Sequence, residues 1–210
     1  MAAGRGDFAA IVLAAGSSIR FGPENKLLAD AGGRPLVARV VAPLLACGLS
    51  PVIIVTGHER DQVEAALAGL QVEFVHNARY LDGMGGSVAA GVSAVLAGVA
   101  GILITPGDTP NLSKALLERL LSAFAAAAGE KIVFPLTSAG EQRNPVIWPA
   151  RLLPELATLR GEKGAKAIIG RYPLETIGVP VADDDDLLDI DRVEDLEQWR
   201  TGNRHRRRDG

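Results

Sequence analysis

Short apolar stretches alternate with longer amphipathic stretches along most of the chain. The apolar stretches are rich in β-branched residues, and several are apolar throughout, which is typical of strands covered on both faces. We therefore predict strands at 8–14, 51–57, 72–77, 101–107, 131–136, 145–149 and 174–181.

The segments between these strands follow a helical pattern. Helices are predicted at 35–47, 60–68, 86–96, 113–127, 150–159, 164–171 and 193–200. Such alternation favours an α/β fold, in which a mostly parallel sheet lies between two layers of helices. At 210 residues and 48% hydrophobic side chains, the chain suits one domain, residues 1–202, followed by a basic tail at 203–210 that we expect to be disordered.

Composition limits the partners and the cellular location that can be expected. A net charge of −3 gives no reason to expect a nucleic-acid partner, and glycine or charge interrupts each apolar stretch before 18 residues, so we expect no membrane span. Cys47 is the single cysteine, which excludes an internal disulfide and is typical of a reducing compartment. With no apolar core of signal-peptide type at the start, the expected location is cytoplasmic.

The stretch LAAGSSIRFGPENKLL follows the first predicted strand, at the edge where open parallel sheets bind ligands. Gly16 lets backbone approach a ligand, and successive N–H groups of residues 15–18 can form an anion-binding concavity. Arg20 and Lys26 add positive charge. These features indicate a phosphate site, although the spacing matches neither the Walker pattern nor the dinucleotide fingerprint. A glycine-rich turn with exposed charges is the alternative.

Two further segments carry candidate ligand-binding residues, and the first of them ends at the same edge. GILITPGDTP ends a strand in Asp108, which is placed to hold Mg²⁺ against phosphate oxygens or, alternatively, to cap the following turn. In NARYLDGMGGSVAAGV, Gly83, Gly85 and Gly86 allow a close backbone approach just before a helix, with Ser87 near its N-terminus.

Charged residues later in the chain suggest a second ligand. Arg143 with Asn144, and Lys163 with Lys166, form a cationic patch suited to a phosphorylated acceptor, or else plain surface charge. The run 183–186 is better explained as a solvated turn than as a metal site. Asp189 and Asp191 are candidates for a second metal or acceptor contact, or for a cap before the last helix.

These segments together resemble the nucleotidyltransferases of molybdenum cofactor maturation, and within them the molybdenum cofactor cytidylyltransferases. The resemblance rests on LAAGSSIRFG with NK, then DGMGGS, GDTP, RNPVIW, GEKGAKAII and LLDIDRVEDL, in that order over residues 8–200. It implies a Rossmann-like nucleotidyltransferase fold and transfer of CMP from CTP to the terminal phosphate of molybdenum cofactor. A recipient molybdoenzyme is an expected further partner.

The resemblance also implies roles for individual residues. Arg20 and Lys26 would hold the triphosphate, and Asp108 would bind Mg²⁺, for which Mn²⁺ can substitute. Asp191 is a further candidate metal ligand. The implied nucleotide-binding residues are Leu13, Ala14, Ala15, Gly16, Ser17, Gly83 and Ser87. The acceptor-binding residues are Arg143, Asn144, Lys163 and Lys166.

Ala15 favours the cytidine-using branch, because guanosine-using relatives usually carry glycine there. The departures from the pattern are Thr109, Asn144, Glu162 and Lys166, all on the acceptor side. A different NTP-dependent nucleotidyltransferase, using GTP or a sugar-phosphate acceptor, therefore stays open. A non-enzymatic cofactor carrier is a further alternative, against which Arg20, Lys26 and Asp108 argue.

Overall fold

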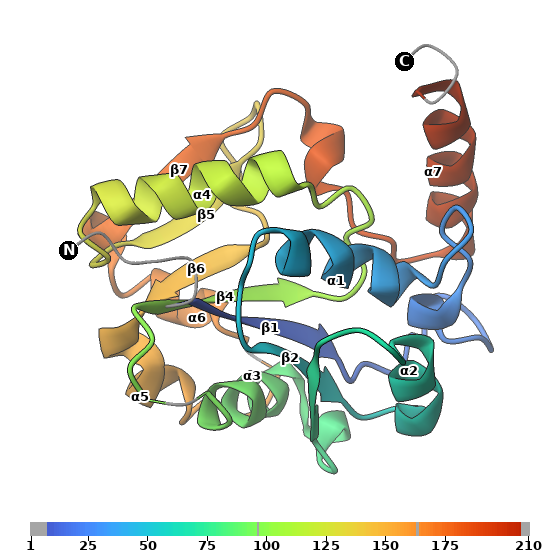
Figure 1. The fold of residues 1–210 in the computed structure, drawn as a ribbon, viewed down its shortest axis with the longest axis horizontal. Coiled ribbons are helices and arrows are strands. Elements are labelled where there is room, and N and C mark those ends of the chain that lie inside the picture. The colour runs from blue at the N-terminus through green and yellow to red at the C-terminus, as the bar shows by residue number, and fades with distance from the viewer. Residues whose placement is uncertain (1–7, 96, 163, 207–210) are drawn as a thin grey trace.

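A computed structural model describes residues 8–95, 97–162 and 164–206. All seven predicted strands are present, each within two residues of its expected bounds. They are β1 (Phe8–Ala14), β2 (Val52–Thr56), β3 (Glu73–His76), β4 (Gly101–Pro106), β5 (Ile132–Leu136), β6 (Val146–Pro149) and β7 (Thr176–Pro180). They form one sheet in the order β3-β2-β1-β4-β6-β5-β7 (Figure 1).

The predicted helices are also present, with changes at some ends. They are α1 (Leu36–Ala46), α2 (Arg60–Ala66), α3 (Met84–Ser93), α4 (Lys114–Ala126), α5 (Leu153–Leu156), α6 (Lys166–Ile169) and α7 (Val193–Arg206). Short 3-10 helices add Lys26–Leu28, Tyr80–Asp82, Ala150–Leu152, Pro173–Glu175 and Asp184–Leu187. No helix in the described ranges has both the length and the apolar character that crossing a membrane requires.

Two helix predictions need correction. The helix expected at 150–159 is a 3-10 turn followed by α5, because Pro154 has no N–H to continue a helix begun at Ala150. The backbone of α7 stays helical to Arg206, into the segment expected to be a tail, and residues 207–210 lie outside the described part.

The sheet is mostly parallel, as predicted. β1 pairs in parallel with β2 and β4, β2 with β3, and β5 with β7. β6 runs antiparallel to both of its neighbours, β4 and β5. Residues 137–145 are too few for the crossover helix that a parallel connection needs, so the chain turns back on itself.

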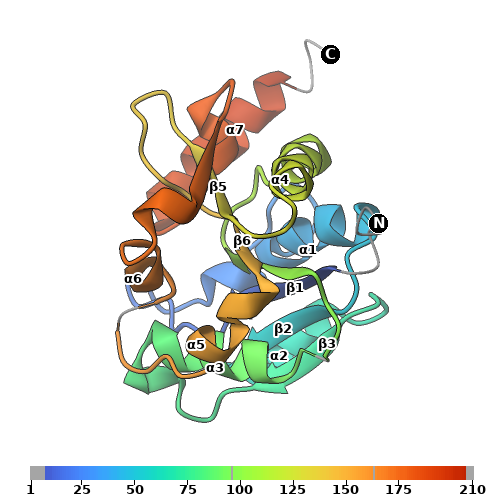
Figure 2. The ribbon, with the colours of Figure 1, turned by 90° about the vertical axis from the view of Figure 1, so that its left-hand side faces the viewer.

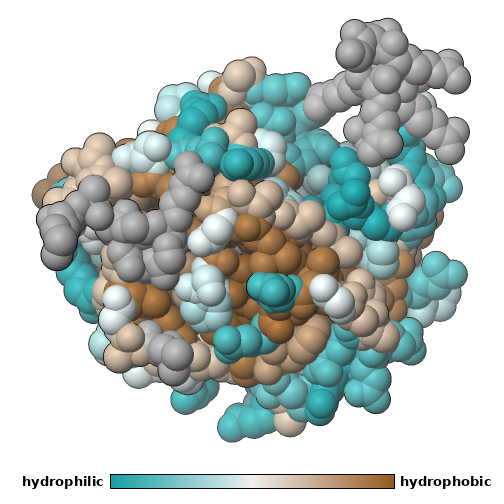
Figure 3. Space-filling model, viewed as in Figure 1, coloured by the Kyte–Doolittle hydropathy of each residue, from teal (hydrophilic) through white to brown (hydrophobic). Residues whose placement is uncertain are grey.

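Helices cover both faces of the sheet (Figures 1 and 2). One buried cluster joins the sheet to α1, α2 and α4, and another joins its opposite face to α3, α5 and α6. Ala10, Val12 and Ala14 of β1 belong to the first cluster, and Ala9 and Ile11 to the second, as a period of two requires. On the outside, hydrophobic residues gather in the middle of the α1 face, with hydrophilic residues around the margin (Figure 3).

Helix α7 stands at the carboxyl edge of the sheet, beside the loop that follows β1 (Figure 1). A third buried cluster joins them, made of Phe21, Ala31, Leu36, Ile190, Leu196 and Trp199. Trp199 Nε1 donates to Asn111 Oδ1 at 2.7 Å, and the Arg39 guanidinium lies 4.8 Å from the Trp199 ring centroid. These contacts fix the segment 189–191 at the edge where β1 and β4 end.

Candidate active site

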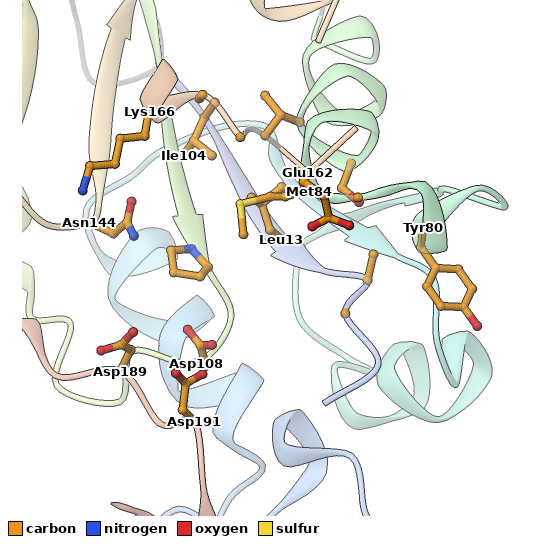
Figure 4. A pocket seen from close by; sticks show the side chains of 18 of the residues that line it. Leu13, Tyr80, Met84, Ile104, Asp108, Asn144, Glu162, Lys166, Asp189 and Asp191 are labelled. Carbon is orange, nitrogen blue, oxygen red and sulfur yellow. The ribbon is translucent and has the colours of Figure 1, made fainter. Parts of the chain in front are cut away.

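A cavity of about 790 Å³ opens at the carboxyl ends of β1 and β4 (Figure 4). Most of the predicted site residues line it. They are Leu13, Ala15, Gly16, Ser17, Arg20, Lys26, Gly83, Ser87, Asp108, Arg143, Asn144, Lys166 and Asp191. Lys163 lies outside the described residues. Segments spread over nearly the whole chain thus meet in one cavity.

Ala14 is the exception among the predicted nucleotide-binding residues. Its side chain is fully buried in the cluster under α1 and α4, whereas Leu13 and Ala15 line the cavity. Successive side chains of a strand point to opposite faces, so three consecutive residues cannot all face one ligand. The expectation that Ala14 lines the base and ribose is therefore wrong for its side chain.

The loop after β1 leaves room for a ligand and fixes Lys26. A Cβ atom on Gly16 would meet no atom within 4 Å, so this backbone borders open space. Asn25 is buried, and its Oδ1 accepts from Leu27 N at 3.0 Å and from Ser18 Oγ at 3.4 Å. Asn25 therefore caps the 3-10 helix that begins at Lys26 and ties it to the glycine loop.

The Lys26 ammonium lies at the centre of the charged end of the cavity. It donates to Asp108 Oδ2 at 2.6 Å, to the Ile190 carbonyl at 2.8 Å and to Asp191 Oδ1 at 3.2 Å. Arg20 Nη1 lies 2.8 Å from the other oxygen of Asp191. The two residues predicted to hold phosphate thus contact the carboxylates predicted to hold metal.

Asp108 is held from two sides. Its backbone carbonyl accepts from Ile190 N at 3.0 Å, which joins the turn after β4 to the segment before α7. Burial raises the pKa of the Asp108 carboxyl, and Lys26 opposes that rise. Asp108 Oδ1 is buried and has no hydrogen-bond partner. An oxygen of this kind suits a cation ligand.

The acidic residues fit a divalent cation that also has phosphate ligands. Asp108 and Asp191 share the Lys26 ammonium, and Asp189 borders the same cavity (Figure 4). Within the described ranges, no group of three or more acidic, histidine or cysteine side chains is arranged to hold a metal by itself. Mg²⁺ commonly uses one or two carboxylates together with substrate phosphate oxygens, and this donor set meets that need.

The cap of α7 comes from neither Asp189 nor Asp191, which the sequence offered as alternatives, but from Asp195. Asp195 Oδ2 accepts from Asp191 N at 3.0 Å and from Arg192 N at 2.7 Å, at the start of α7. This reach back from the first helical turn satisfies N–H groups at the helix start. The Asp191 carboxylate is therefore left to face Lys26 and Arg20.

Ala15 and Ser87 shape the side of the cavity predicted to bind the base. A Cβ on Gly57 would lie 2.8 Å from Ala15 Cβ and 2.7 Å from Tyr80 Cβ, so Gly57 provides the room for both. Asn77 Nδ2 donates to Ser87 Oγ at 3.0 Å, which leaves the Ser87 hydroxyl hydrogen to donate to a ligand. Asn77 was not predicted; its only signal was a polar residue at the end of a strand.

The glycines at the start of α3 pack against protein rather than only against a ligand. A Cβ on Gly83 would lie 2.4 Å from the carbonyl carbon of Gly161, and one on Gly85 would lie 2.8 Å from Arg160 O. Gly85 N donates to Gly161 O at 2.9 Å. The prediction of a close backbone approach is confirmed, but its partner at Gly83 and Gly85 is the loop at 160–162.

The predicted acceptor residues lie across the cavity from Tyr80. In Figure 4, Lys166 and Asn144 stand at one end and Tyr80 at the other. Arg143 also lines the cavity and is paired with Glu141 at 3.0 Å. Glu162, which the sequence marked only as a departure from the family pattern, lines the cavity beside Met84 (Figure 4). The cavity therefore carries a carboxylate between the predicted acceptor residues and Tyr80 (Figure 4).

The acidic run 183–186 forms a turn away from this cavity, as expected. Asp184 accepts from the backbone N and from Oγ of Ser138, both at 2.7 Å, and these bonds lower the pKa of its carboxyl. Asp183 accepts from Asp185 N at 3.0 Å. The run stabilises a connection between two loops.

The fold and the cavity combine a mostly parallel sheet with a glycine-containing loop, two cations and an aspartate at its carboxyl edge, which is the arrangement expected of a nucleotidyltransferase fold. The chain belongs to the family described as the MobA-like NTP transferase domain, which residues 10–176 match.

Relatives and solved structures agree with this class. The bifunctional protein GlmU of Agrobacterium fabrum is 36% identical over 128 residues, which is 59% of this chain and 28% of that protein. The GlmU of Anaeromyxobacter sp. (strain K) is 32% identical over 174 residues, 78% of this chain and 36% of that protein. The chain thus spans only about a third of the length of these relatives.

Among solved structures, a nucleotidyl transferase from Methanothermobacter thermautotroptrophicus superposes with a TM-score of 0.78 at 25% identity, covering 93% of this chain and 96% of that one. The fold is also that of Rv0371C from Mycobacterium tuberculosis in complex with manganese. Its TM-score is 0.76 at 23% identity, covering 92% of this chain and 98% of that one.

Proposed function

We propose that the protein transfers CMP from CTP to the terminal phosphate of molybdenum cofactor, giving the cytosine dinucleotide form of the cofactor and pyrophosphate. The observation that supports CTP is the position of Ala15. Its side chain borders the cavity, and its Cβ and that of Tyr80 both lie over Gly57, so little room is left for the Ala15 methyl group to move away from a ligand. A methyl group there limits the space for a base and favours the smaller pyrimidine ring.

The chemistry needs positioning and charge rather than a base. An oxygen of the acceptor phosphate attacks the α-phosphorus of the nucleotide, and the bond to the leaving pyrophosphate breaks. The attacking oxygen is already anionic at neutral pH, so no proton has to be removed. Arg20, Lys26 and the N–H groups after Ala15 would bind the phosphates and orient them for this displacement.

Asp108 and Asp191 would hold Mg²⁺, and that ion would neutralise charge on the α-phosphate and pyrophosphate. The unpartnered Asp108 Oδ1 supports this assignment. The manganese complex of Rv0371C supports Mn²⁺ as a substitute.

The acceptor end of the cavity supports a ligand that is both ionic and flat. Arg143, Asn144 and Lys166 offer donors to a phosphate, with Lys163 as a further proposed donor. Between them and Tyr80, Met84 and Ile104 give apolar surface (Figure 4), and Val146 also lines the cavity. Such surface suits the ring system of a pterin, and the Glu162 carboxylate can accept from ring N–H groups.

We also propose the cytoplasm as the location, because the single cysteine, Cys47, excludes an internal disulfide and is typical of a reducing compartment. A molybdoenzyme is the proposed recipient of the product.

Pyrophosphate release tests the proposal. The protein is incubated with Mg²⁺, each of the four NTPs in turn, and either molybdenum cofactor or a panel of sugar phosphates. We expect release with CTP and molybdenum cofactor. Release with a sugar phosphate alone would transfer the assignment to a different acceptor, and preference for GTP would contradict the cytidylyl assignment. Nucleotide binding without release in any combination would favour a carrier.

A further inference from the structure

Lys26 uses its whole hydrogen-bonding capacity on the acidic end of the cavity. An ammonium has three N–H groups, and its three acceptors here are Asp108 Oδ2, the Ile190 carbonyl and Asp191 Oδ1. The Lys26 side chain is only 14% exposed. It therefore neutralises the two carboxylates from within the site rather than pointing toward a ligand.

A divalent cation would need the same carboxylates. Mg²⁺ bound to Asp108 and Asp191 would approach carboxylate oxygens of these residues to roughly 2.0–2.1 Å. An ammonium 2.6 Å from Asp108 Oδ2 would then face the ion across the same carboxylate, in a largely buried setting. Repulsion between like charges is strong where water is excluded, so the two partners compete.

The surrounding residues offer Lys26 an alternative position. The 3-10 helix that begins at Lys26 lies next to the loop after β1, to which Asn25 ties it. The phosphates of a nucleotide on that loop would offer several anionic acceptors to the ammonium. The carboxylates would meanwhile be released.

We propose that Lys26 and the divalent cation are alternative partners of Asp108 and Asp191, and that bound phosphate draws Lys26 away so that the cation can enter. Lys26 thereby couples metal binding to nucleotide binding: each strengthens the other, as linkage between two sites requires. The inference rests on the nucleotide and metal part of the proposed function. It does not depend on which base or acceptor is used.

The test measures the dissociation constant of Mn²⁺ alone, by electron paramagnetic resonance, with no nucleotide present. Lys26→Met removes the charge and keeps the chain length, and Lys26→Gln keeps hydrogen bonding without charge. Both variants should bind Mn²⁺ about tenfold or more tightly than wild type, since one competing positive charge is gone. Lys166→Met is the matched control, because it removes the same charge from the same cavity without touching the two carboxylates.

Wild-type affinity in both Lys26 variants would overturn the proposal. Equal tightening by Lys166→Met would also overturn it, because the effect would then be long-range charge alone. If neither Lys26 variant folds, a nuclear magnetic resonance measurement on the wild type tests the proposal instead. The ¹⁵N signal of the Lys26 ammonium should shift when Mg²⁺ and inorganic pyrophosphate are added together, and its constancy would contradict the exchange. Neither readout requires turnover, so loss of the CTP or molybdenum cofactor assignment leaves the test intact.

Discussion

Gly83 and Gly161 lie in direct backbone contact, so close that a Cβ atom added to Gly83 would stand 2.4 Å from the carbonyl carbon of Gly161. Gly83 also has a φ of +113°, a conformation that other residues rarely adopt. The loop before α3, on the base side of the cavity, is therefore joined to the loop that leads to Lys166. Two predicted ligand subsites share one packing contact.

Gly83→Ala should lower the free energy of unfolding by about 2 kcal/mol or more, because the methyl group meets backbone that cannot move aside cheaply. Gly86→Ala is the control, since its Cβ would meet nothing nearer than Asn77 Nδ2 at 3.6 Å. Urea denaturation measures both variants. Equal stabilities would show that the loop at 161 yields easily.

Asp108→Asn should abolish turnover while nucleotide still binds measurably. The loss of an anionic metal ligand mainly removes charge stabilisation from the transition state. Asp189→Asn serves as a comparison, because Asp189 borders the cavity but is not a partner of Lys26. Pyrophosphate release and nucleotide titration check the two variants. Near wild-type release by Asp108→Asn would remove Asp108 from the mechanism.

Lys26→Ala should reduce kcat/KM on the order of 10²-fold or more, as expected for a fixed charge facing a developing negative charge. The same variant should bind free Mn²⁺ more tightly, so metal affinity and rate change in opposite directions. Lys114→Ala removes a half-exposed charge on α4 and should change neither quantity. Steady-state kinetics that do not distinguish the two variants would reduce Lys26 to a structural residue.

Ala15→Gly should weaken the preference for CTP over GTP without destroying activity. Shape contacts of one methyl group are worth roughly 1–3 kcal/mol in discrimination, and hydrogen bonds to the base edge add more. The measurement is kcat/KM for both nucleotides, in wild type and variant, at one Mg²⁺ concentration. A wild type that uses GTP as well as CTP would contradict the role given to Ala15.

Asp184 predicts a pH dependence of stability. Its two bonds from Ser138 lower the pKa of its carboxyl below the ordinary value of 3.8, so the native state prefers the ionised form. The resulting stabilisation is present above pH 3.8 and is lost as pH falls through the lowered pKa. Unfolding free energies of wild type and Asp184→Asn should therefore differ at pH 5–6 and converge in acid. A difference that persists or grows in acid would refute this linkage.

Much of the fold could be predicted, because the hydrophobic pattern of each segment indicates its secondary structure and the length of each connection limits how neighbouring strands pair. β-branched runs gave the strands, and their alternation with helices gave a mostly parallel sheet. The antiparallel direction of β6 could also have been predicted, because the connection at 137–145 is too short for a crossover helix. The split at Pro154 was likewise present in the sequence, as a proline inside a predicted helix.

The site was predictable where it depends on strand ends, and less so where distant segments pack. Gly16, Lys26 and Asp108 follow strands that end at one edge, so their meeting in one cavity could be expected. The glycine at position 83 predicted a close backbone approach, but the sequence did not indicate that Gly161 is the residue it contacts. Two of the three bonds of Lys26, those to the Ile190 carbonyl and to Asp191, depend on the docking of α7, which no local pattern specifies.

The docking of α7 also determines when, during synthesis, the charged residues around Lys26 can come together. Asp191 stands 165 positions after Lys26, and the helix that holds it in place follows it. Because a ribosome adds residues from the amino end, the glycine loop and Lys26 emerge long before their acidic partner exists. A nascent chain that ends before Asp191 therefore carries the glycine loop and Lys26 without the complete charge cluster.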